Sequence, residues 1–147
     1  MSASPLRRVA APLVVLLSLG CLVPLATRAR EDVPEDIARK QNPVTLTDAR
    51  VRYFKRQYRA KCARCHGAAG DGGGEEAKEQ PVPPRDLTNG EYMSSRSDGQ
   101  LFYQILVGGG DRCAMPAFGP ESAHAWNDEK IWGMVAYVRR FARPPEK

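Results

Sequence analysis

No stretch of the 147-residue sequence alternates apolar and polar residues like a half-buried β-strand, and no internal repeat is present. These absences exclude a sheet-based fold and a repeat array. Apolar residues instead recur at helical spacing in three segments, which are separated by stretches containing many of the 13 glycines and 12 prolines. We therefore expect a small all-α domain with long loops, whose thin core would gain from a large apolar cofactor.

Acidic residues are missing from residues 1–29, which differ in character from the remainder. Two arginines precede an apolar run over residues 9–26, the pattern of an export signal, and cleavage after Ala29 would fit. The run is close to the ~20 residues that span a bilayer, so a retained membrane anchor is a second interpretation and lipidation at Cys21 a third. All three place the domain in the periplasm or at the outer face of the cytoplasmic membrane.

Residues 30–147 also lack a large excess of charge of one sign. Residues 1–29 hold three of the 22 basic residues and none of the 17 acidic ones, so the remainder carries a net charge of +2. This near balance argues against a nucleic-acid partner. Basic residues do gather over residues 50–64, either as a solvated helix face or as a docking face for an acidic partner.

The chain divides into a linker, a domain and a tail. Residues 30–46 are charged and contain two prolines, so we expect a tether or an irregular arm there. The domain is expected over residues 47–143, followed by a tail at 144–147. A first helix should begin near Thr47, with one face formed by Val51, Phe54, Tyr58 and Cys62.

Two further helices carry start signals. Ser97 and Gln100 have the spacing of a capping box, and the helix behind them should end at glycines 108–110. Asn127 is a suitable N-cap for the last helix, which has acidic residues in its first turn. Residues 75–97 are expected to be mostly loop because their prolines forbid regular helix.

Cys62 and Cys65 lie three positions apart, but the sequence lacks a second such pair. Structural zinc needs four ligands, commonly from two pairs, and Cys113 with His124 does not have that spacing. A thioredoxin-like dithiol requires a βαβ context, which is missing as well. Both interpretations are therefore disfavoured.

The pattern C-x-x-C-H at residues 62–66 is instead the attachment signature of c-type haem. Two thiols one helical turn apart can bond the two vinyl groups on one porphyrin edge. The imidazole of His66 then lies over the iron as an axial ligand. Covalent haem c at Cys62, Cys65 and His66 also agrees with export, because this haem is attached outside the cytoplasm.

Met115 is the candidate for the second axial ligand. It lies in a turn-rich loop far along the chain, where Pro116 fixes the backbone, whereas Met93 and Met134 are expected to pack in the core. A thioether ligand favours reduced iron and raises the potential relative to two imidazoles. Ligation by His66 and Met115 leaves no open coordination position, which favours electron transfer over substrate turnover.

These motifs resemble the class I (mono-haem) cytochrome c family of bacterial type over roughly residues 47–143. The resemblance rests on "CARCHG" followed by "AAGDG", on "MPAF" from Met115, and on "IWGMVAYVRRF" near the end. "PPRDLT" is also similar to haem subunits of some terminal oxidases. The resemblance implies a cytochrome c fold of about three to five helices, with long loops wrapped around one covalent haem.

The implied function is that of a non-enzymatic carrier of single electrons between exported or membrane-bound redox partners. Two alternatives stay open at this point. The chain could be a haem-bearing subunit of an oxidase or dehydrogenase complex, or a haem sensor in which Met115 is displaced.

The resemblance also implies that the terminal helices cross, with Tyr58 and Tyr137 at the family's aromatic positions. Phe54 stands where the family usually has glycine, and Gly133 on the last helix could make room for it. A proline carbonyl of the family accepts a hydrogen bond from the axial imidazole, and here Pro83 or Pro84 would supply it.

Three other residues have more than one interpretation. Arg85 or Trp126 could contact a haem propionate, and His124 is expected to be exposed. Cys113 is a small loop residue, an exchange ligand that replaces Met115, or the site of an intermolecular disulfide or adduct.

Overall fold

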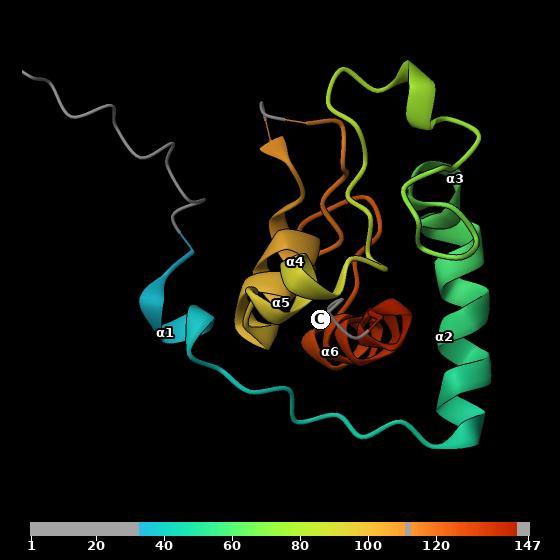
Figure 1. The fold of residues 1–147 in the computed structure, drawn as a ribbon. Coiled ribbons are helices and arrows are strands. Elements are labelled where there is room, and N and C mark those ends of the chain that lie inside the picture. The colour runs from blue at the N-terminus through green and yellow to red at the C-terminus, as the bar shows by residue number, and fades with distance from the viewer. Residues whose placement is uncertain (1–32, 111–112, 144–147) are drawn as a thin grey trace, which may run out of the picture. The chain divides into compact units, whose positions relative to one another are not determined.

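The computed structural model describes residues 33–110 and 113–143 (Figure 1). The export-signal, anchor and lipidation interpretations, which concern residues 1–29, and the tail at 144–147 therefore lie outside the described residues.

The described residues form α-helices and no strands, which confirms the all-α expectation. The six α-helices are α1 Glu35–Ala38, α2 Asp48–Lys61, α3 Ala63–His66, α4 Gly90–Ser94, α5 Asp98–Val107 and α6 Asp128–Val138. The 3-10 turns Ala77–Glu79 and Arg139–Phe141 accompany them. Three helices are long, and α6 packs against both α2 and α5 (Figure 1).

The expected helix starts are confirmed. The Thr47 hydroxyl accepts a hydrogen bond from the N–H of Arg50, and Ser97 and Gln100 form both bonds of a capping box. The Asn127 side chain accepts from the N–H of Lys130 at 3.0 Å. These local bonds satisfy N–H groups that the first helical turn leaves without partners.

Residues 75–97 are mostly loop, as expected, but they also contain the short helix α4, which was not predicted. Asn89 caps this short helix by accepting a hydrogen bond from the N–H of Tyr92 at 2.8 Å. Met93 anchors it, because this side chain is 1 % exposed within the core. A single turn with one buried residue has too little periodicity to be recognised from sequence.

The crossing of α2 and α6 confirms the predicted pairing of Phe54 with Gly133. A Cβ atom built at Gly133 would collide with the Phe54 ring. One turn further along, the Tyr58 ring centroid lies 5.8 Å from that of Tyr137 and 4.8 Å from that of Phe141. The Phe54 ring on α2 is therefore accommodated by the absence of a side chain at Gly133 on α6.

Replacing Gly133 should destabilise the domain. We expect Gly133→Ala to lower the free energy of unfolding by about 1–3 kcal/mol, because an overpacked helix contact outweighs the gain in helix propensity. Urea unfolding of the holoprotein would measure the loss. In a Phe54→Leu background the same substitution should cost less, and an equal cost in both backgrounds would contradict the contact.

The segment expected to be a linker packs on the domain. A Cβ atom at Gly99 would collide with the carbonyl of Ile37, so α1 and α5 touch closely. The Asn42 side chain donates a hydrogen bond to the Trp132 carbonyl at 2.9 Å. Apolar side chains scattered among the charges of this segment lie against the core. From Val33 onward the segment is thus an arm held on the domain surface.

Candidate haem site

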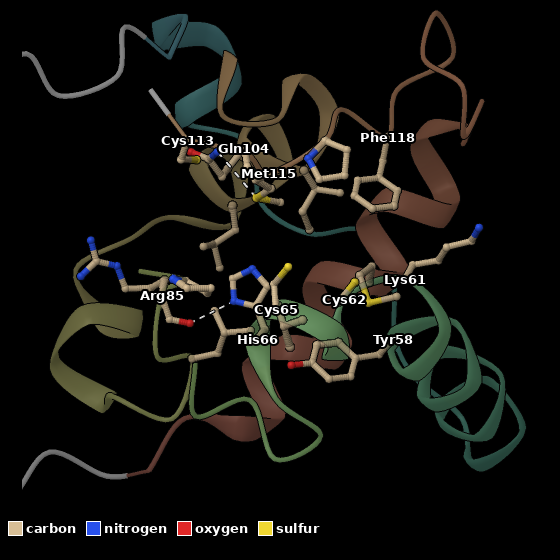
Figure 2. A pocket seen from close by; sticks show the side chains of 18 of the residues that line it. Tyr58, Lys61, Cys62, Cys65, His66, Arg85, Gln104, Cys113, Met115 and Phe118 are labelled. Atoms are coloured by element: carbon tan, nitrogen blue, oxygen red, sulfur yellow. Dashed lines mark hydrogen bonds between the residues drawn. The ribbon is translucent and has the colours of Figure 1, made fainter. Parts of the chain in front are cut away.

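A cavity of about 290 Å³ lies between the α2–α3 side of the domain and the loop that follows α5 (Figure 2). Its walls are largely apolar and include Tyr58, Leu101, Phe118, Trp126, Met134 and Val138. The four residues predicted to bind the cofactor, Cys62, Cys65, His66 and Met115, line this same cavity. A cavity of this kind suits a large, mostly apolar ligand held by a few directed contacts.

The change from α2 to α3 positions the two thiols. Cys62 ends α2, where its N–H donates to the Tyr58 carbonyl at 2.8 Å, and it also begins the single turn of α3. Its carbonyl then accepts from the N–H groups of Cys65 and His66 at 3.2 and 2.9 Å. Both cysteines are free of disulfides and stand one turn apart, as attachment through two bonds requires.

The thiols have the wrong acidity for a redox dithiol. Burial raises the pKa of the Cys62 thiol to about 12, with a further contribution from neighbouring Cys65. Burial, followed by the nearby Glu76 carboxylate, also raises the pKa of Cys65. Reactive dithiols instead have a lowered pKa. The disfavoured thioredoxin-like interpretation gains no support from the site.

His66 is held by a backbone carbonyl. Its Nδ1 lies 3.0 Å from the carbonyl oxygen of Arg85, and because a carbonyl can only accept, Nδ1 carries the proton. Burial lowers the pKa of His66 and outweighs the opposite effect of this hydrogen bond. The imidazole is therefore neutral, and Nε2 keeps a lone pair with which it can bind a metal.

The Arg85 carbonyl corrects the expectation that Pro83 or Pro84 would hold the imidazole. The Pro84 carbonyl is directed elsewhere: a Cβ atom at Gly72 would lie 2.8 Å from its oxygen. The backbone N–H of Gly72 donates a hydrogen bond to the His66 carbonyl at 2.9 Å, which holds the glycine loop beside His66. The carbonyl that reaches His66 is therefore that of Arg85, whereas the Pro84 carbonyl oxygen lies close to Gly72.

Met115 faces the cavity from the wall opposite His66 (Figure 2). Its carbonyl accepts from the N–H of Gly109 at 2.9 Å, which fixes the loop against the end of α5. Met93 and Met134 are each 1 % exposed, as expected of core residues, although Met134 also forms part of the cavity wall.

Gln104 is a site residue that sequence reasoning missed. Its side-chain nitrogen lies 3.8 Å from the sulfur of Met115. The helical spacing between Gln104 and Gly108 is visible in the sequence, but the approach of the Met115 loop is not.

Trp126 and Arg85, the two candidates for contact with a haem propionate, both line the cavity. Trp126 is buried, whereas Arg85 is exposed and its guanidinium lies 4.5 Å from the centre of the Tyr92 ring. His124, expected to be exposed, is half-buried and stacks on Phe118 with ring centroids 4.4 Å apart. The backbone N–H of Trp126 donates to the Phe118 carbonyl, which closes the loop that carries His124.

Cys113 lies on the same side as Met115 (Figure 2). It is half-buried, lines the cavity and packs so closely on Gly109 that a Cβ atom there would collide with its sulfur. This packing agrees with a small loop residue and leaves the other two interpretations of Cys113 as predictions.

The donor set fits a covalently attached haem. Two free thiols at one-turn spacing, a neutral imidazole with an available Nε2 and a mostly apolar cavity occur together at one place. Cys62 and Cys65 would hold the porphyrin edge and His66 would bind the iron. Across residues 33–110 and 113–143, no helix has the length and hydropathy that crossing a membrane requires.

Two solved structures are similar to this chain. A reducing HAO-like protein complex of Kuenenia stuttgartiensis, Kustc0457/Kustc0458, contains a chain that is 27% identical, with a TM-score of 0.57 over 69% of this chain. The present chain spans only 47% of that protein. The KustC0563 c-type cytochrome shares 24% identity, with a TM-score of 0.47 over 61% of this chain and 98% of its own. No significant match was found among curated proteins.

A family model gives the broader assignment. The model described as "Cytochrome C oxidase, cbb3-type, subunit III" matches residues 49–138, which is more than half of the chain and includes the entire cavity. The chain therefore belongs to this family of c-type cytochromes, with a fold of the cytochrome c type and a covalently bound haem c.

Proposed function

We propose that the protein carries single electrons through one haem, held covalently by Cys62 and Cys65 and ligated by His66 and Met115. The supporting observation is that His66 and Met115 face one cavity from opposite walls (Figure 2). An iron with both axial positions filled can change its charge without binding a substrate. The surrounding apolar walls keep water from the site and limit reorganisation when the charge changes.

Absorption spectroscopy of the purified holoprotein tests this proposal. The reduced protein should have the α-band of a c-type haem, and the oxidised protein a weak near-infrared sulfur–iron band. Carbon monoxide should not bind rapidly to the reduced protein. Rapid binding would instead support the sensor alternative, in which Met115 leaves the iron.

Permanent residence in a redox complex is the second candidate function. The description of the matched family favours it, because it names a subunit of an oxidase. The Kuenenia stuttgartiensis relative also belongs to a complex. Purification from native membranes in mild detergent distinguishes the two: a carrier separates alone, whereas a subunit migrates with its oxidase or dehydrogenase.

We propose an exported location, in the periplasm or at the outer face of the cytoplasmic membrane. Proteins with c-type haem are typically exported, and the apolar run at residues 9–26 supports the same location. Mass spectrometry of the mature N-terminus, combined with cell fractionation, would identify cleavage, retention or lipidation. A soluble cytoplasmic holoprotein would contradict the proposal.

Helix α2 provides a further test through its charge. Its exposed cations make no ion pair with another described residue and comprise Arg52, Lys55, Arg56, Arg59 and Lys61. Lys61 also lines the cavity, so positive charge reaches its rim. We expect oxidation of the reduced protein by anionic ferricyanide to slow several-fold as salt shortens the Debye length from ~30 to ~3 Å.

Arg59→Glu should reduce both the rate at low salt and its salt dependence. Lys40→Glu is the matched control, because Lys40 is exposed on the N-terminal arm outside this helix. Stopped-flow measurement at several ionic strengths compares the variants. Equal effects of the two substitutions would attribute the attraction to net charge and remove the role of the α2 face.

A further inference from the structure

Gln104 joins the end of α5 to the proposed sulfur ligand. Its side chain is half-buried and lines the cavity. The side-chain nitrogen donates a hydrogen bond to the Gly108 carbonyl at 2.9 Å and lies 3.8 Å from the Met115 sulfur (Figure 2). Gly108 is four residues after Gln104, at the end of the same helix, whereas Met115 is brought to Gln104 by the loop that follows.

The Gly108 bond determines which end of the amide faces Met115. A backbone carbonyl can only accept, so the nitrogen of Gln104, and not its oxygen, must lie beside Gly108. That nitrogen carries two hydrogens, and one of them remains available for the sulfur. A thioether is a weak acceptor, which agrees with the longer distance to Met115.

The backbone keeps the two groups together. Gly108 has a φ of +71°, a left-handed conformation that turns the chain out of α5. A Cβ atom there would lie 2.6 Å from the Met115 carbonyl, so only glycine allows the loop to approach so closely. The backbone N–H of Phe118 donates a hydrogen bond to the Ile105 carbonyl at 3.0 Å. Backbone hydrogen bonds before and after Met115 in the chain therefore hold its loop against the end of α5, next to Gln104.

We propose that Gln104 is a positioning residue for Met115, and that its N–H draws electron density from the sulfur and thereby raises the redox potential. This inference rests on the proposed ligation by Met115. A thioether sulfur has two lone pairs, so one can bind iron while the other accepts the N–H. A sulfur that donates less stabilises the oxidised iron less, which favours the reduced state.

Gln104→Leu in the full-length holoprotein tests the inference, with Gln80→Leu as the matched control. Gln80 also lines the cavity, but its side chain donates to the Glu76 carbonyl and not to Met115. We expect Gln104→Leu to lower the midpoint potential, to shift the sulfur–iron band and to strengthen the binding of added imidazole to the oxidised protein several-fold. Gln80→Leu should leave all three as in wild type.

The outcomes separate this inference from the ligation on which it depends. A wild-type protein without the sulfur–iron band would overturn both. A wild-type protein with the band, together with an unchanged potential and band in Gln104→Leu, would overturn only the role of Gln104.

If Gln104→Leu does not retain haem, NMR of the reduced wild-type protein decides the question without a variant. Slowly exchanging side-chain amide protons of Gln104, with a through-space contact to the Met115 methyl group, would support the inference. An amide that exchanges as in free solvent would overturn it.

Discussion

Cys62→Ser combined with Cys65→Ser is expected to abolish covalent haem, so that acid–acetone extraction removes all remaining cofactor from the protein. Each thiol supplies one bond to the porphyrin, and both line the cavity from the turn that begins at Cys62. Either single substitution should leave one bond and shift the reduced α-band toward that of a haem with a free vinyl group. Denaturing gels stained for haem, together with absorption spectra, measure both effects.

Cys113→Ser is the matched control for this prediction. Cys113 is also a half-buried, free cysteine in the cavity wall, but it lies outside the C-x-x-C-H turn. We expect it to keep covalent haem at the wild-type level. Loss of haem in Cys113→Ser, or retention in the double variant, would contradict the assignment of the attachment residues.

The double substitution should also weaken the fold. Side chains that surround the cavity, including Tyr58 and Trp126, would lose the apolar surface that a bound haem offers them. A ligand that binds only the folded state stabilises it, so its loss lowers stability. We expect reduced helix content by circular dichroism for the variant purified without haem, whereas Cys113→Ser should resemble wild type.

The parts of the fold that could be predicted are those with local causes. Thr47, Ser97 and Asn127 each cap the helix that follows through a bond to a residue three positions later, and the sequence displays that spacing. Phe54 and Gly133 could be paired through the family resemblance, which places Phe54 at the helix contact, where a large residue requires a small one on the other helix. The packing of the arm on the domain and the formation of α4 could not be predicted, because long-range contacts stabilise these short segments with few apolar residues.

The candidate site divides in the same way. The pattern over residues 62–66 is contained in one turn, so its residues could be identified directly. Met115 could be proposed from its loop, because a ligand must come from across the cavity. The Arg85 carbonyl could not, since every residue supplies a backbone carbonyl and only the course of the folded chain decides which one reaches His66.

Met115→Ala is expected to remove the near-infrared sulfur–iron band and to lower the midpoint potential by a sizeable part of the ≈ 0.8 V range that axial ligands cover. The proposed ligand lies on the cavity wall opposite His66, and alanine cannot replace its sulfur (Figure 2). The vacated position should bind carbon monoxide in the reduced protein. Met115→His should also lose the band and lower the potential, but it should exclude carbon monoxide, since two imidazoles fill both positions.

Met134→Leu distinguishes Met115 from the other methionine of the cavity wall. Met134 is 1 % exposed on α6 and lines the same cavity, so proximity alone does not separate the two. Leucine preserves its volume and removes its sulfur, which should cost little stability. We expect Met134→Leu to keep the sulfur–iron band and the wild-type potential. A band that survives Met115→Ala and disappears in Met134→Leu would transfer the ligand role to α6, and Gln104 would then have no sulfur ligand to position.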